Sequence, residues 1–259
     1  MIQKEFAEKA RGILHEDPFV TGLAVGGSWL TDEMDEFSDL DLILVTGEKI
    51  SDNKSEMLNY AGRLGKLLTG FTGEHVGEPR VLICLYDDPL LHVDIKFLTI
   101  DEFGHRVEDP YILFDREDQL RQVLAKTTAG FPHPDYQWIE DRFWIWVHYV
   151  LLKIGRGEYM EAVDFFGFLR MVVFGPLLHI KNGNQPRGVR KVETMLDKDD
   201  FQRIRSTVPA YEKHSVLEAL KNSVELYRSL RSVLYTDHVV LRTETEKKVM
   251  DYMIKIENG

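Results

Sequence analysis

The sequence predicts an α+β protein with a mixed sheet and packed helices, followed by an all-helical part. In residues 1–130, short strand-like runs alternate with amphipathic helices, whereas residues 131–259 show helical periodicity almost throughout. The proline-rich segment 131–134 separates the two patterns. A chain of 259 residues is long for one domain. We therefore expect two domains, 1–130 and 131–259, with the functional cleft between them.

The first domain is expected to be built from short elements in alternating order. Strand runs are rich in β-branched and apolar residues, and helices carry apolar residues at a spacing of three or four. Asp87-Asp88-Pro89 is a turn signal between two strands. The predicted elements are helix 2–15, strand 19–25, strand 39–45, a helix capped at Ser51-Asp52 and running to about Leu68, strands 80–86 and 91–98, and a short strand 111–114.

The second domain is expected to pack around one aromatic-rich helix, 136–154. Its apolar residues cover nearly the whole circumference, which is typical of a central, buried helix. Further helices are predicted over 158–179 and 216–234, with a loop at 181–186. The sequence contains no internal repeat that would suggest another architecture.

Composition excludes several classes of protein. The formal net charge of −11 argues against a long nucleic-acid partner, because such binding needs clustered lysine and arginine. The single cysteine, Cys84, lies in an apolar run and is expected to be a buried thiol, so no intramolecular disulfide can form. We find no signal peptide and no apolar run of membrane-spanning length, so no membrane partner is expected and the cytoplasm is the expected location.

The most informative pattern is a glycine turn followed by two acids. Gly26-Gly27-Ser28 can let the backbone approach a phosphate closely, and its N–H groups can bind oxygen anions. Asp39 and Asp41 follow in an apolar strand. Because alternate strand residues share a face, both carboxylates point the same way and are spaced to bind a hard divalent cation.

A second strand offers a third acid. His92, Asp94 and Lys96 alternate with apolar residues and so share one face of strand 91–98. If this strand lies beside the Asp39 strand, Asp94 completes a cluster of three carboxylates.

Together these motifs resemble the polymerase-beta-type nucleotidyltransferase superfamily, and within it the small-molecule adenylyltransferases of the streptomycin and lincosamide type. The motif match covers roughly the first hundred residues. The resemblance implies that Asp39, Asp41 and Asp94 are catalytic and hold Mg²⁺, while Gly27 and Ser28 hold the terminal phosphates of ATP or another nucleoside triphosphate. It also implies transfer of AMP to a hydroxyl of a small acceptor, with aminoglycoside or lincosamide antibiotics as candidates, and release of pyrophosphate.

Three side chains near these motifs have competing interpretations. Asp94 can ligate metal, act as general base, or be a surface acid, and His92 can tune it or simply be hydrated. His92-Val93-Asp94 also mimics the His-x-Asp of antibiotic kinases, but those need asparagine where this chain has Thr99. Lys153, near the end of the aromatic helix, either matches the helix dipole or reaches the triphosphate.

Three functions stay open at this point. The first is adenylylation of a small hydroxylated molecule, and the second is modification of a protein, as in antitoxin-like nucleotidyltransferases. The third is a nucleotide-binding module that has lost catalysis. The large helical domain favours the first over the second, and the retention of three acids argues against the third.

Overall fold

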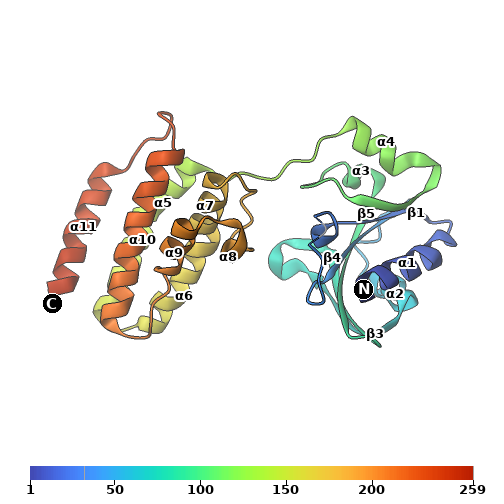
Figure 1. The fold of residues 1–259 in the computed structure, drawn as a ribbon, viewed down its shortest axis with the longest axis horizontal. Coiled ribbons are helices and arrows are strands. Elements are labelled where there is room, and N and C mark those ends of the chain that lie inside the picture. The colour runs from blue at the N-terminus through green and yellow to red at the C-terminus, as the bar shows by residue number, and fades with distance from the viewer. Residues whose placement is uncertain (32, 259) are drawn as a thin grey trace. The chain divides into compact units, whose positions relative to one another are not determined.

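The computed structural model describes residues 1–31 and 33–258, which divide into two compact units, Met1–Phe131 and Pro132–Gly259. The first unit holds a six-stranded sheet with helices, and the second is helical (Figure 1). The predicted α+β class is confirmed. The expected cleft between the two parts stays a prediction.

The sheet of the first unit is mixed and has the strand order β3-β4-β5-β2-β1-β6. Its central pair, β2 and β5, is parallel, and every other neighbouring pair is antiparallel. The parallel pair lies at the middle of the sheet, where both strands have neighbours on each side. The strands are β1 (Val20–Val25), β2 (Leu40–Thr46), β3 (Lys66–Gly73), β4 (Glu78–Asp87), β5 (Leu91–Thr99) and β6 (Tyr111–Asp115).

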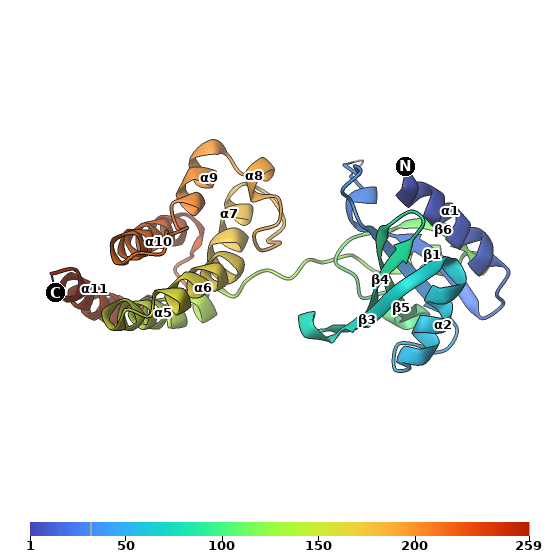
Figure 2. The same cartoon turned by 90° about the horizontal axis from the view of Figure 1, so that it is seen from below.

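Helices cover the two faces of this sheet unequally. α1 (Ile2–His15) and α2 (Lys54–Leu64) lie together against one face, where they form the larger core of the unit (Figure 2). α3 (Ile100–Phe103) and α4 (Gln119–Lys126) contribute to a much smaller core on the other face. The period-two alternation of the strands produces this division, because every second side chain of β2 and β5 enters the larger core.

The second unit packs around α5 (Tyr136–Arg156), as its apolar circumference predicts. Eight of its side chains are buried, and α6, α10 and α11 all contact it. The chain leaves α6 through one π-helical turn, Arg170–Phe174, directly before Gly175-Pro176, where proline has no N–H to donate. The remaining helices are α6 (Tyr159–Leu169), α7 (Gly175–Lys181), α8 (Val192–Met195), α9 (Lys198–Arg205), α10 (Lys213–Leu234) and α11 (Thr243–Asn258).

One helical run, Tyr159–Lys181, is long and apolar enough to cross a membrane by length and composition, with a mean hydropathy of 1.6. The expectation that no segment reaches this length is therefore wrong for this run. Half of the run is buried inside the helical unit, and Phe166, Leu169 and Leu177 have no exposed surface there. The core helix of a helical bundle meets the same criteria.

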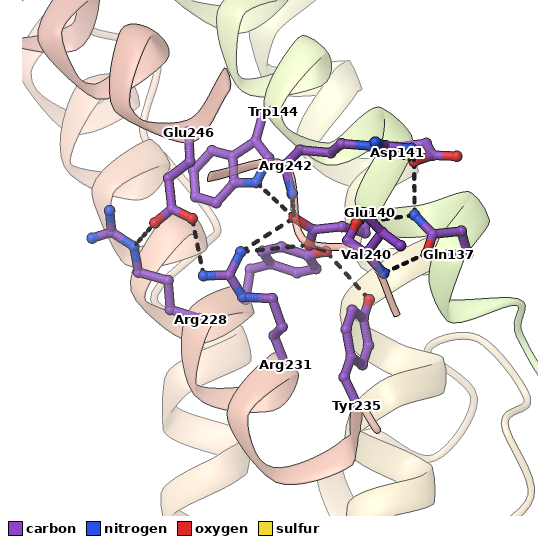
Figure 3. A network of polar contacts seen from close by, with 11 residues as sticks. Gln137, Glu140, Asp141, Trp144, Arg228, Arg231, Tyr235, Val240, Arg242 and Glu246 are labelled. Carbon is purple, nitrogen blue, oxygen red and sulfur yellow. Dashed lines mark hydrogen bonds and ion pairs between the residues drawn. The ribbon is translucent and has the colours of Figure 1, made fainter. Parts of the chain in front are cut away.

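A buried glutamate of α5 binds α10 and the segment before α11 in the second unit (Figure 3). Glu140 has no exposed surface and accepts hydrogen bonds from the Tyr227 hydroxyl at 2.6 Å and the Arg242 backbone N–H at 2.8 Å. Arg231 lies 3.3 Å away and Trp144 donates its indole N–H at 3.3 Å. A buried charge is tolerated when it is paired and hydrogen-bonded in this way, so the network fixes how α5, α10 and the segment before α11 meet.

The structure corrects the sequence prediction at one junction. The helix predicted to reach Leu68 ends at Leu64, and residues 66–73 form the edge strand β3 instead. Gly65 is fully extended, with φ of 179°, and so breaks the helix before the strand begins. The helix also starts later than expected, with Asn53 rather than Ser51-Asp52 as its cap. Helices α3, α4, α8, α9 and α11 were not predicted.

Candidate functional site

The two acid-bearing strands of the sequence lie side by side. β2 and β5 are parallel neighbours, and Asp41 is the register partner of Asp94. Asp39 precedes the first residue of β2, and two residues along an extended chain return to the same face. The sheet therefore brings the three predicted carboxylates to one end of its central parallel pair.

These acids lie on the less covered face of the sheet. Leu40, Leu42 and Leu44 point into the larger core, so Asp39 and Asp41 point the opposite way. On that opposite face, Val45 and its partner Leu98 belong to the small core formed with α3 and α4. The Asp41–Asp94 pair lies at the other end of the same strands and is only half-buried. The acidic side chains thus lie at the opposite end of these strands from the small core formed with α3 and α4.

Asp94 lies in an environment that shifts its pKa. Burial raises the pKa of Asp94, and the nearby charge of Asp39 raises it further, while His92 opposes both effects. Nε2 of His92 lies 2.9 Å from Oδ1 of Asp94, and the histidine side chain is half exposed. The structure thus places His92 against Asp94, where it partly compensates the carboxylate charge.

The glycine turn lies directly beside Asp41. The Gly26 N–H donates to the Asp41 carbonyl oxygen at 3.0 Å, and a 3-10 turn over Gly27–Trp29 follows, with Ser28 half-buried in it. Gly27 has φ of +62°, which favours glycine. A Cβ at Gly27 would lie only 2.0 Å from Oδ2 of Asp41, so the carboxylate occupies the space that the missing side chain leaves.

A fourth carboxylate, Glu108, also contacts this turn, and the sequence analysis missed it. The Gly27 N–H donates to Oε1 of Glu108 at 3.0 Å across 81 positions of sequence. No local motif marks Glu108, which lies in the loop between α3 and β6. Only the pairing of β1 with β6 reveals the contact, because Val25 and Tyr111 are register partners.

The donor chemistry of the site suits a hard divalent cation, but the present side-chain positions do not form a ligand set. Mg²⁺ prefers carboxylate oxygens and keeps some of its water. Within residues 1–31 and 33–258, no three His, Cys, Asp or Glu side chains converge closely enough to hold a metal ion. Asp94 is bonded to His92, and the Asp41 carboxylate lies against Gly27. Backbone register and donor type therefore fit the cation, and its binding requires these side chains to turn toward one another.

Lys153 lies in the helical unit, near the end of α5. Its ammonium group bonds Glu158 at 3.0 Å and Glu161 at 2.9 Å, and these two hydrogen bonds, with Glu161 foremost, raise its pKa. The lysine is therefore firmly charged and bonded within its own unit.

The buried-thiol prediction for Cys84 is confirmed. The side chain is 1% exposed on β4, and burial raises the pKa of its thiol to about 12. A thiol with this pKa is protonated at neutral pH and takes no part in nucleophilic chemistry.

Comparisons with known proteins give structural neighbours only. No family model matches the chain, and no curated protein matches it. An aminoglycoside 6-adenyltransferase from Bacillus subtilis is 16% identical, with 99% of each chain covered and a TM-score of 0.40. A nucleotidyltransferase-like protein from Exiguobacterium sibiricum is 14% identical, with 96% of this chain and 89% of that chain covered and a TM-score of 0.34. Both descriptions name the class that the sequence motifs resemble, but at these TM-scores the likeness carries no argument about chemistry or substrate.

Proposed function

We propose that this protein is a nucleotidyltransferase of the polymerase-beta type that transfers a nucleoside monophosphate, AMP from ATP, to a hydroxyl of a small molecule. The observation that carries the proposal is the register of Asp41 with Asp94 on the parallel strands β2 and β5, with Asp39 at the same end. A glycine turn borders this acid cluster at Asp41. Three carboxylates and a phosphate-compatible turn at one open end of a sheet are what such a reaction requires.

In the proposed reaction, an oxygen of the acceptor forms a bond to the α-phosphorus as the bond to the pyrophosphate oxygen breaks. Mg²⁺, when bound by Asp39, Asp41 and Asp94, supplies positive charge that neutralises the triphosphate and makes the hydroxyl more acidic. Asp94 is also the proposed acceptor of the hydroxyl proton, as the general base of the reaction. The turn at Ser28 meets the terminal phosphates.

Lys153 enters the proposal as a phosphate ligand. Its raised pKa keeps the ammonium charged, and the triphosphate would take over hydrogen bonds that Glu158 and Glu161 now accept. The acceptor is proposed only as a small hydroxylated molecule, with amino-sugar and lincosamide antibiotics as the first candidates.

Calorimetric titration of ATP with and without Mg²⁺ tests the proposal, beside Asp39→Asn. We expect Mg²⁺-dependent binding that the variant loses, since the substitution removes charge and keeps shape. Asp52→Asn, whose side chain is 74% exposed and which follows the opposite end of β2 from Asp39, is the matched control and should bind as wild type. Absence of binding in the wild-type protein across several triphosphates would refute the proposal.

The second step of the test is the transfer itself. Hydroxylated candidates are incubated with MgATP, and acceptor mass and pyrophosphate are measured together. Asp39→Asn or Asp41→Asn should lower the rate by about three decades, the loss expected when key transition-state stabilisation is removed. Pyrophosphate release accompanied by a mass increase on a protein would instead favour the protein-modifying alternative.

A further inference from the structure

The loop between α3 and β6 delivers a carboxylate to the glycine turn. Glu108 is half-buried, and its Oε1 accepts the Gly27 N–H at 3.0 Å. A Cβ at Gly26 would lie 3.5 Å from the same oxygen. The carboxylate therefore binds Gly27 and lies beside Gly26.

The sheet explains how two distant segments meet here. β1 and β6 are antiparallel, and Val25 at the end of β1 pairs with Tyr111 at the start of β6. The chain leaving β1 and the chain entering β6 consequently emerge at the same end of the sheet. Gly26 and Gly27 follow Val25 directly, and Glu108 comes shortly before Tyr111, so the ladder brings them together.

The Glu108 loop is anchored by a neighbouring arginine. The Arg106 side chain is only 9% exposed and donates to Asp109 at 2.6 Å and to the Thr127 carbonyl oxygen at 2.9 Å. Its own carbonyl oxygen accepts the Gly130 N–H at 3.0 Å. These contacts hold the loop on both sides of Glu108, so the carboxylate is presented to the turn from a fixed support.

Gly27 is thus held between two carboxylates. Glu108 binds its N–H, while Oδ2 of Asp41 occupies the space beside its Cα, 2.0 Å from where a Cβ would stand. A glycine peptide has wide conformational freedom, and a hydrogen bond to its N–H removes much of it. Any shift of this turn also changes the space available to the Asp41 carboxylate.

We propose that Glu108 is a positioning residue of the site: by accepting the Gly27 N–H, it fixes the turn and, through the turn, the Asp41 carboxylate and Ser28. The inference rests on the proposed function. Because the Gly27 N–H is engaged by Glu108, Ser28 is the residue of the turn that meets phosphate. The anchored loop favours this role over a gate in which phosphate displaces the carboxylate.

Two substitutions separate hydrogen bonding from charge. Glu108→Gln keeps a carbonyl oxygen that can accept the Gly27 N–H, whereas Glu108→Ala removes the acceptor. Glu16→Ala is the matched control, since its side chain is 87% exposed at the end of α1. The readouts are the Gly27 amide signal and its hydrogen exchange in ¹⁵N-glycine-labelled protein, MgATP affinity, and kcat and KM for transfer.

For Glu108→Ala we expect the Gly27 amide signal to shift and its hydrogen exchange to become faster. We also expect kcat to fall by about ten- to hundredfold with a smaller change in the KM for ATP, because misplaced catalytic groups slow chemistry more than binding. Glu108→Gln should restore the Gly27 amide and most of kcat. A Gly27 amide unchanged in Glu108→Ala would overturn the inference. So would tighter MgATP binding in both variants, which would mean that the carboxylate competes with phosphate.

The amide readout needs no nucleotide, so the two proposals fail in distinguishable ways. If wild-type protein binds no triphosphate, the proposed function fails, and the role of Glu108 in positioning catalytic groups fails with it. If the Gly27 amide signal still changes in Glu108→Ala, Glu108 holds the turn, but for a function other than nucleotidyl transfer. If wild-type protein is active and Glu108→Ala is equally active, only the present inference is refuted.

Discussion

Replacing Gly27 by alanine tests the geometry of the glycine turn, because two constraints meet at this position. The backbone has φ of +62°, and the new Cβ would lie 2.0 Å from Oδ2 of Asp41. Since real Cβ contacts essentially never fall below 3.0 Å, the carboxylate has to move by about 1 Å or more. The substitution therefore displaces a carboxylate of the proposed site without removing it.

The two effects have different magnitudes. A left-handed backbone costs alanine about 1–2 kcal/mol of stability relative to glycine. Displacement of a catalytic group by about 1 Å lowers the rate of transfer by about 10²-fold. We therefore expect Gly27→Ala to stay folded, with a modest loss of stability and a large loss of activity.

Gly77→Ala supplies the control for the backbone effect. Gly77 has φ of +80° and no atom within 4 Å of the position of a new Cβ, so it shares the conformational cost without the collision. Gly26→Ala is a second control, because its φ is −122° and its nearest neighbours lie at 3.5 and 4.0 Å. Urea unfolding measures stability, and pyrophosphate release with the acceptor identified by mass shift measures activity.

The comparison of Gly27→Ala with Gly77→Ala decides the argument. Similar losses of stability, with loss of activity in Gly27→Ala alone, would support the close approach of Gly27 and Asp41. Equal activity in the two variants would refute the reasoning, because the collision would then have no effect on the acid.

Three further predictions follow from other parts of the fold. Glu140→Ala should lower the free energy of unfolding by about 3–5 kcal/mol, because the buried Tyr227 hydroxyl and the Arg242 backbone N–H lose their acceptor and Arg231 keeps only Glu246 as a partner. Asp141→Ala at the exposed edge of the same network should cost about 1 kcal/mol or less, and urea unfolding measures both. Burial lowers the pKa of His179 below the ordinary value of 6.5. The stability contributed by the neutral, buried ring is therefore present above pH 6.5 and is lost as pH falls below it. A His179→Gln variant should show a smaller fall in stability over that range. Asp39→Asn should lower the pKa of Asp94, followed by NMR titration of its carboxyl carbon, and an unchanged pKa would show that the two acids do not interact.

The sequence could place Asp39 and Asp41 on one face of a strand because the rule behind that prediction is local. Two aspartates separated by one apolar residue in a strand must share a face, whatever the rest of the fold does. Asp94 could be added because its own strand alternates and because the motif order resembles a known superfamily. The strands do lie side by side, and the structure adds that they are parallel, which the sequence did not predict.

The parts of the fold and of the site that the sequence did not predict depend on contacts between residues far apart in the chain. Glu108 reaches Gly27 across 81 positions, and only the β1–β6 ladder brings them together. The predicted helix after Asn53 was too long because Leu67 and Leu68 continue its apolar spacing. In the structure Gly65 ends the helix, and the residues after it pair with β4 as a strand. Spacing alone cannot weigh a helix against a strand whose partner lies elsewhere.

The position of the site within the first unit follows from the cost of placing like charges together. Burial raises the pKa of Asp94 and the charge of Asp39 adds to the rise, so keeping Asp94 charged beside Asp39 opposes folding at neutral pH. The fold offsets this with the larger core on the opposite face, to which Leu40, Leu42 and Val93 of the same strands contribute. Strand alternation thus lets one pair of strands carry both a hydrophobic core and a repulsive acid cluster. A cation bound between the acids would relieve the repulsion, and added Mg²⁺ should therefore stabilise wild-type protein more than it stabilises Asp39→Asn.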